Sequence, residues 1–116
     1  MTPPKDLLLA TAVLVDIESE SHNEAAITAH LEARLRAVPW LDVTRVDNNL
    51  VARTSFGLGS RLILAGHTDT VPANGNATAR IEGDVLHGLG AADMKGGLAV
   101  FMALAEAIAA PAVDVT

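Results

Sequence analysis

Two short segments, LILAGHTDTVP at 62–72 and GLGAADMKGG at 88–97, hold the residues best suited to chemistry. His67 follows an apolar run, and Asp93 lies among glycines at the start of an apolar helical pattern. Imidazole and carboxylate groups bind divalent cations such as zinc, cobalt, manganese and magnesium. A carboxylate has two oxygens and can bridge two cations, as two-metal hydrolytic sites require. We therefore predict a two-metal site, with His67 as a terminal ligand and Asp93 as a bridging ligand.

Asp69 lies two residues after His67, so both side chains point to the same side if the chain stays extended. A metal-binding histidine usually donates its second ring N–H to a carboxylate or carbonyl. Asp69 is the predicted orienting partner, through its side chain or the local backbone. Each residue also has an ordinary structural explanation, because an isolated histidine is commonly just hydrogen-bonded and an aspartate beside glycines often forms a turn or helix cap.

Other features of the sequence exclude several classes of function. The chain has no cysteine, which excludes disulfides and thiolate metal sites, and its net charge of −6 with scattered basic residues argues against nucleic-acid binding. GLGAAD at 88–93 has Asp93 where a dinucleotide fingerprint has its third glycine. His22, His30 and His87 are expected to be structural, and Lys95 is expected to meet solvent or a nearby carboxylate.

The sequence predicts alternating helices and strands. Thr2 and Pro3 begin a helix that runs to about Ile17, and Ser21 and Glu24 have capping-box spacing before a second helix. That second helix has one apolar stripe, an i,i+4 pair of Glu32 and Arg36, and an end at Pro39. The residues of the stripe are Ile27, Leu31, Leu35 and Val38.

Several strands and one more helix follow. Strands are predicted at 40–46 and 50–54 around a turn at 47–49, and a hairpin at 79–88. RLILAG at 61–66 is apolar without alternation, which predicts a central strand covered on both faces. A helix from Met94 to about Ala109 and a strand at 112–116 complete an α/β, layered helix/sheet/helix domain. Ligands gather at the carboxyl ends of strands in such sheets, where His67 would lie.

The longest apolar run, at 7–15, is far shorter than the roughly 20 residues of a membrane-spanning helix. A signal peptide is an alternative for this run, but acidic residues bracket it, so a cytoplasmic location is expected. The chain ends inside a strand that has just begun, which leaves ladder groups unpaired. We therefore expect residues 1–116 to be the N-terminal portion of a longer catalytic domain.

The segments AGHTDTVP at 65–72 and LHGLGAADMKGGLAVFMALA at 86–105 resemble the zinc-dependent aminoacylase/carboxypeptidase superfamily of metallopeptidases and deacylases. The resemblance implies that His67 binds a metal, that Asp69 is catalytic, and that Asp93 bridges two divalent ions, zinc or cobalt. It also implies a di-zinc peptidase-like fold. The catalytic glutamates and the lid domain used for homodimerisation would lie outside this chain, which alone would be inactive.

Within the superfamily, NNLVART at 48–54 and GAADMKGGLAVF at 90–101 resemble actinobacterial succinyl-diaminopimelate desuccinylases. That resemblance implies hydrolysis of N-succinyl-LL-2,6-diaminopimelate, on the route to lysine, with a small N-acyl amino acid as substrate and no nucleic-acid or membrane partner. His87 and Leu89 depart from the usual pattern. Acetylornithine deacetylase, a related dipeptidase or carboxypeptidase, and a non-catalytic scaffold remain alternatives.

Overall fold

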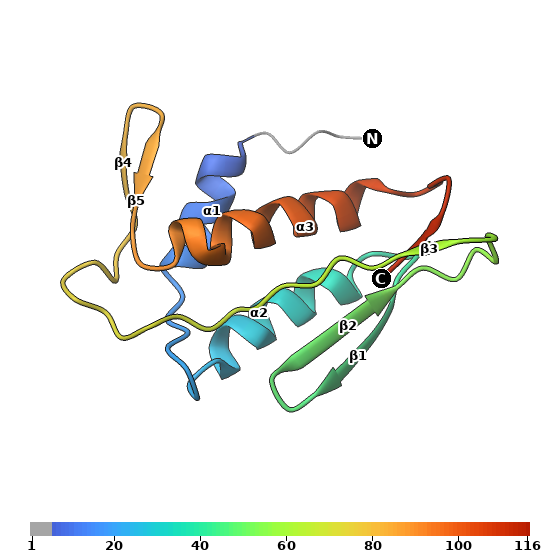
Figure 1. The fold of residues 1–116 in the computed structure, drawn as a ribbon, viewed down its shortest axis with the longest axis horizontal. Helices are drawn as coiled ribbons and strands as arrows, with labels where there is room; N and C mark the ends of the chain where they lie inside the picture. Colours follow the sequence, from blue (N-terminus) through green and yellow to red (C-terminus); the bar gives the residue numbers. More distant parts are fainter. Residues whose placement is uncertain (1–5) are drawn as a thin grey trace.

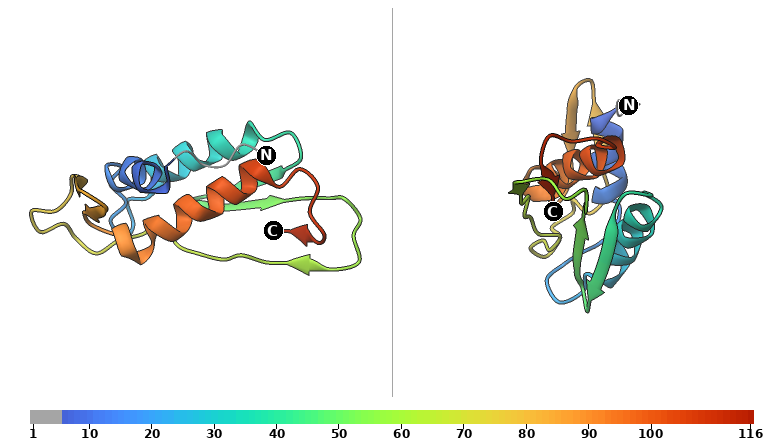
Figure 2. Two further views of the ribbon diagram at one scale, coloured as in Figure 1. Left: turned by 90° about the horizontal axis from the view of Figure 1, so that it is seen from above. Right: turned by 90° about the vertical axis from the view of Figure 1, so that its right-hand side faces the viewer.

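The computed structural model describes residues 6–116, which form an elongated α/β fold with one hairpin toward one end and another alongside a central helix (Figures 1 and 2). The helices are α1 (Leu7–Val15), α2 (Ala25–Arg36) and α3 (Gly96–Ala107), and an irregular helical turn, η1 (Ala91–Lys95), leads into α3. The strands are β1 (Asp42–Val46), β2 (Asn49–Arg53), β3 (Arg61–Leu62), β4 (Arg80–Glu82), β5 (Val85–His87) and β6 (Asp114–Val115). The predicted α/β class is confirmed.

The start of α1 differs from the prediction. Asp6 caps this helix, because its carboxylate accepts hydrogen bonds from the backbone N–H groups of Leu8 and Leu9. The predicted cap at Thr2 and first turn at Pro3 lie outside the described residues. The helix ends at Val15, two residues before the predicted end.

The predicted capping box before α2 is wrong. Glu24 occupies the cap position without a side-chain hydrogen bond to the helix, and its carboxylate instead accepts from the backbone of His22. The Ser21 hydroxyl turns away from α2 and donates to Asp69. The Ser21 hydroxyl therefore bonds to Asp69, which is distant in sequence, instead of capping α2 as its spacing from Glu24 predicted.

The apolar stripe of α2 is buried as predicted, and the Glu32–Arg36 ion pair forms at 3.0 Å. Helices α2 and α3 enclose the core, with one residue of α1 (Figure 1). Small and aliphatic side chains fill it because the chain has few aromatic residues. The core residues are Leu14, Ile27, Leu31, Leu35, Leu98, Ala99 and Met102.

The strands form three separate two-stranded sheets within the described residues. β1 pairs antiparallel with β2, β4 pairs antiparallel with β5, and β3 pairs parallel with β6. The two antiparallel pairs confirm the predicted hairpins. The first turn is at 47–48, because Asn49, predicted in the turn, begins β2, and the second is at Gly83–Asp84 within the predicted hairpin at 79–88.

The prediction of a buried central strand at 61–66 is wrong for this structure. β3 covers only Arg61 and Leu62, and the chain from 63 onward is extended without regular pairing. Leu62 is 52% exposed and Ile63 is 67% exposed. Within residues 6–116 only β6 pairs with this strand, so its apolar side chains lack the cover that a second neighbour and two helical layers would provide.

The last helix is placed nearly as predicted. α3 begins at Gly96 rather than Met94, because Asp93 and Met94 have non-helical backbone angles. Leu98 and Met102 are buried, and Phe101, Ala105 and Ile108 are half-buried. None of the helices described for residues 6–116 has the length and apolar character needed to cross a membrane.

Candidate metal centre

His67 lies on the extended segment that follows β3 and passes close to the turn before α3. Its backbone N–H points at the sulfur of Met94, 3.3 Å away. A Cβ on the preceding residue, Gly66, would come within 2.7 Å of the Met94 methyl and 3.2 Å of Phe101. Glycine at 66 therefore permits the close approach of the two segments.

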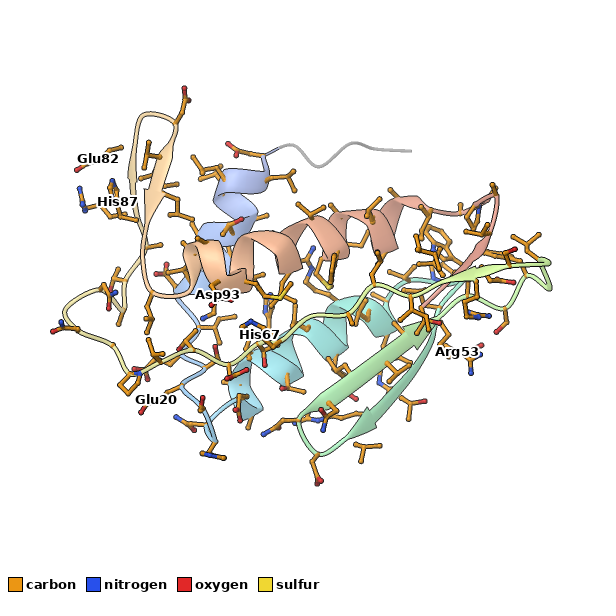
Figure 3. All side chains as sticks on the ribbon, in the orientation of Figure 1. Glu20, Arg53, His67, Glu82, His87 and Asp93 are labelled. Carbon is orange, nitrogen blue, oxygen red and sulfur yellow. The ribbon has the colours of Figure 1, made fainter. Side chains whose placement is uncertain are left out.

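Asp93 is carried by η1, which begins after Gly90 in a left-handed conformation with φ 75°. The backbone of Asp93 is extended, with φ −132° and ψ 91°, and its side chain is 86% exposed. The helical pattern is thus interrupted at the residue whose carboxylate the sequence singled out. That interruption directs the carboxylate out of the helix, toward the segment of His67 (Figure 3).

The structure brings His67, Asp69 and Asp93 together. His67 Nε2 lies 2.9 Å from Asp93 Oδ1. His67 Nδ1 lies 3.2 Å from the backbone oxygen of Asp69 and 3.3 Å from its carboxylate. The hydrogen bond to Asp93 is the main cause that raises the pKa of His67, and the Asp69 backbone oxygen acts in the same direction against partial desolvation.

The donor set fits part of a zinc site. Asp69 contacts Nδ1 of His67, so Nε2 is the ring nitrogen that is left to face a metal ion. Histidine ligands oriented by a carboxylate have this arrangement. Two ligands of one tetrahedral zinc lie roughly 3.4 Å apart, so the 2.9 Å between Nε2 and Oδ1 needs only a small opening. The pair supplies two ligands, and residues 6–116 contain no group of three or more His, Cys, Asp or Glu placed to hold an ion.

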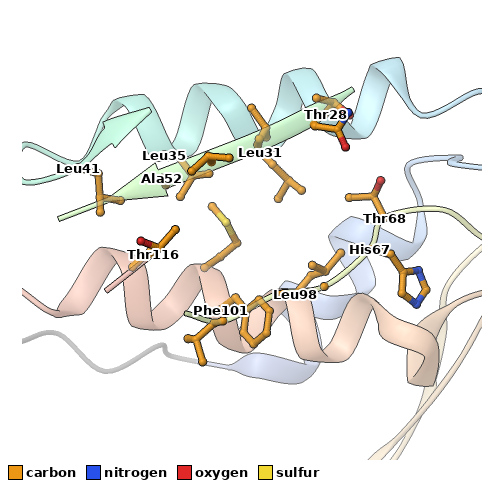
Figure 4. A pocket seen from close by; sticks show the side chains of 18 of the residues that line it. Thr28, Leu31, Leu35, Leu41, Ala52, His67, Thr68, Leu98, Phe101 and Thr116 are labelled. Carbon is orange, nitrogen blue, oxygen red and sulfur yellow. The ribbon is translucent and has the colours of Figure 1, made fainter. Parts of the chain in front are cut away.

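A hollow of about 720 Å³ adjoins His67 between α2, β2 and α3. Its walls are mostly apolar, and they include Leu31, Leu98 and Phe101. Figure 4 shows the His67 ring at one end of this hollow, with Leu41 at the other end. His67 and Asp69 therefore contribute polar groups to a mostly apolar hollow.

The remaining histidines lie apart from His67 and Asp93. His87 Nε2 is 3.5 Å from a Glu82 carboxylate oxygen in the β4–β5 hairpin. His22 has φ 74° in the turn before α2, and His30 lies on α2. Their predicted structural roles stay predictions.

Lys95 is placed differently from the prediction that it meets solvent or a carboxylate. It is 2% exposed, and its ammonium donates to the backbone oxygen of Ile17 at 2.7 Å. Burial lowers the pKa of Lys95, and the charge of Asp16 opposes that effect. Sequence reasoning gave Lys95, Ser19 and Ser21 no place at the site, since their partners lie far along the chain and no local spacing reveals them.

Comparison with known proteins bears on the family that this chain resembles. The pattern that describes peptidase family M20/M25/M40 matches residues 63–115, which include His67, Asp69 and Asp93. Residues 63–115 are therefore similar to a segment of the M20/M25/M40 peptidase family. This match confirms the resemblance drawn from the two motifs.

Several named proteins are similar to this chain over more of its length than residues 63–115. The DapE protein of Mycobacterium tuberculosis strain H37Rv is 50% identical over 112 residues, which are 96% of this chain and 32% of that protein. Succinyl-diaminopimelate desuccinylase of Corynebacterium glutamicum is 46% identical over 99 residues, covering 84% of this chain and 27% of that protein. Succinyl-diaminopimelate desuccinylase of Dinoroseobacter shibae is 37% identical over 117 aligned residues, which cover 90% of this chain and 30% of that protein. The chain spans about a third of the length of these relatives.

Proposed function

We propose that this chain contributes to a metal-dependent hydrolase of linear amides, with N-succinyl-LL-2,6-diaminopimelate as the substrate. The observation that carries the proposal is the 2.9 Å contact of His67 Nε2 with Asp93 Oδ1, beside an Asp69 that engages the other ring nitrogen. The M20 segment and the names of the relatives support the reaction class and the substrate.

Each of the three residues has a distinct role in this proposal. His67 Nε2 would bind one metal ion, and the Asp93 carboxylate would bridge two. Asp69 keeps His67 Nδ1 protonated and the ring fixed, so that Nε2 presents its lone pair. The bound ions would lower the pKa of a water molecule and polarise the scissile carbonyl. The remaining ligands and the general base come from other residues of the complete protein, because residues 6–116 hold no larger ligand group.

The test is an assay of the complete gene product. We expect release of succinate from succinyl-diaminopimelate with a kcat/KM at least about 100-fold above that for acetylornithine. We expect a chelator to abolish turnover and zinc or cobalt to restore it. Faster hydrolysis of acetylornithine or of dipeptides would show that the proposed substrate is wrong. A well-folded protein that binds metal without any turnover would favour a non-catalytic scaffold.

A matched pair of variants tests the site itself. His67→Ala removes a proposed ligand, whereas His87→Ala removes a histidine that lies near Glu82 in the β4–β5 hairpin. We expect the first change to reduce metal content and turnover at least about 100-fold and the second to leave both nearly unchanged. Equal effects of the two changes would contradict the assignment of His67.

The wider setting is also proposed. We infer two zinc or cobalt ions per active site, a cytoplasmic location on the route to diaminopimelate and lysine, and a homodimer formed outside residues 1–116. Metal analysis of the purified protein and its mass in solution test these points. The 116-residue chain alone is expected to bind metal weakly and to show no turnover, and measurable turnover by this chain alone would contradict that expectation.

A further inference from the structure

The segment 17–21, between α1 and α2, contacts the chain on both sides of Asp69. The Ser19 hydroxyl is 1% exposed and donates to the backbone oxygen of Thr68 at 2.6 Å. The backbone of Thr70 donates to Ser19 at 2.9 Å and accepts from Ser21 at 3.1 Å. Residues 68–70 directly follow His67, and each of the three is hydrogen-bonded to segment 17–21.

The same segment holds the chain next to Asp93. The buried ammonium of Lys95 donates to the Ile17 backbone oxygen at 2.7 Å, and the Lys95 backbone donates to Gly90 at 2.8 Å. A buried charge is costly unless it is hydrogen-bonded, so this carbonyl determines where the lysine, two residues after Asp93, can lie. Segment 17–21 thus contacts both segments of the candidate centre.

The contact between the two ligand residues cannot fix their positions by itself. The side chains of His67 and Asp93 are 44% and 86% exposed, and ion pairs open to water contribute little to stability. Ser19 and Lys95 are themselves buried, so their hydrogen bonds are better able to hold a geometry.

We propose that segment 17–21 is a brace that sets the spacing of His67 and Asp93, with Ser19 and Lys95 as positioning residues. The effect of the brace on metal binding rests on the function proposed above. The brace itself does not, since it is a relation between two segments of the chain that can be measured without metal.

The first test uses the complete, metal-free protein and two variants. Ser19→Ala removes the hydroxyl, and Lys95→Met keeps an apolar side chain while removing the ammonium. We expect Ser19→Ala to shift the backbone amide resonances of residues 93–95, and Lys95→Met to shift those of residues 67–70. The control is Thr28→Val, because the buried Thr28 hydroxyl donates to the backbone oxygen of Glu24, the residue just before α2. Shifts confined to the segment that each side chain contacts would overturn the brace, and if Lys95→Met does not fold, Ser19→Ala decides alone.

The second test adds cobalt(II) to the same proteins and records its visible absorption. We expect Ser19→Ala and Lys95→Met to bind cobalt about tenfold more weakly, with an altered spectrum, while Thr28→Val keeps the parent affinity and spectrum. Parent-like affinity and spectrum in both variants would overturn the role of the brace in the metal centre. A parent protein that binds no cobalt would instead contradict the proposed function. The amide shifts of the first test would still support or overturn the brace.

Discussion

The γ-methyl group of Thr70 packs so closely against Gly90 that a Cβ at residue 90 would come within 2.7 Å of it. Thr70 is buried three residues after His67, and Gly90 lies three residues before Asp93. The two segments of the candidate metal centre therefore touch directly, in addition to their contacts with the brace.

Gly90→Ala should destabilise the protein more than Gly75→Ala. Both glycines have positive φ, 75° and 72°, so each alanine adds about 1–2 kcal/mol of backbone strain. Only Gly90 has a close neighbour, whereas nothing lies within 4 Å of a Cβ at Gly75. Overpacking against Thr70 should add about 1–3 kcal/mol to the loss of unfolding free energy, measured by urea denaturation. Equal losses of unfolding free energy in the two variants would show that Thr70 moves aside from the new Cβ at no energetic cost.

Asp69→Asn should weaken metal binding by about 10–100-fold in the complete protein, because a neutral amide holds the His67 ring less firmly than a carboxylate. Titration with zinc against a competing chelator measures the effect. Asp84→Asn, in the exposed β4–β5 turn, removes the same charge away from the centre and is the control. Unchanged affinity in Asp69→Asn would leave the orienting role to the Asp69 backbone oxygen alone.

Asp114 should make the stability of the protein depend on acid pH. Its buried carboxylate accepts from the Thr54 hydroxyl at 2.6 Å and from the backbone of Phe56 and Leu58 at 2.9 and 2.8 Å. These hydrogen bonds, led by that of Thr54, lower the pKa of Asp114 from 3.8 to about 2.

A lowered pKa means that the folded state favours the ionised carboxylate, so the stabilisation is complete above pH 3.8 and is lost as pH falls toward 2. Asp114→Asn should be less stable at neutral pH and should lose stability less steeply between pH 4 and 2, a window set by that shift. Urea unfolding at a series of pH values measures both effects. A variant with the same slope as the parent would contradict this account.

Asp6→Ala should cost about 1 kcal/mol of unfolding free energy, because two backbone N–H groups at the start of α1 lose their acceptor. Asp6→Asn keeps an acceptor at the cap and should cost less than half as much. Thermal unfolding of the three proteins gives the comparison. An alanine variant as stable as the parent would mean that α1 is held by its packing against α3 alone.

The parts of the fold that the sequence predicted correctly depend on neighbours along the chain. The stripe of α2 follows from helical periodicity, and the turns at 47–48 and 83–84 follow from residues that favour tight turns. The capping box failed because Ser21 has a competing partner, Asp69, that is distant in sequence. The buried strand at 61–66 failed because apolar character predicts burial only where other elements provide the cover.

The sequence alone determined the chemistry that is available: a histidine and two aspartates on glycine-flanked segments, in an order that resembles a known peptidase family. Only the tertiary structure decided that His67 meets Asp93, that Lys95 is buried against Ile17, and that Ser19 holds Thr68. The reason is physical. Local preferences act between residues a few positions apart, whereas these contacts join groups that become neighbours only when the helices pack and exclude water between them.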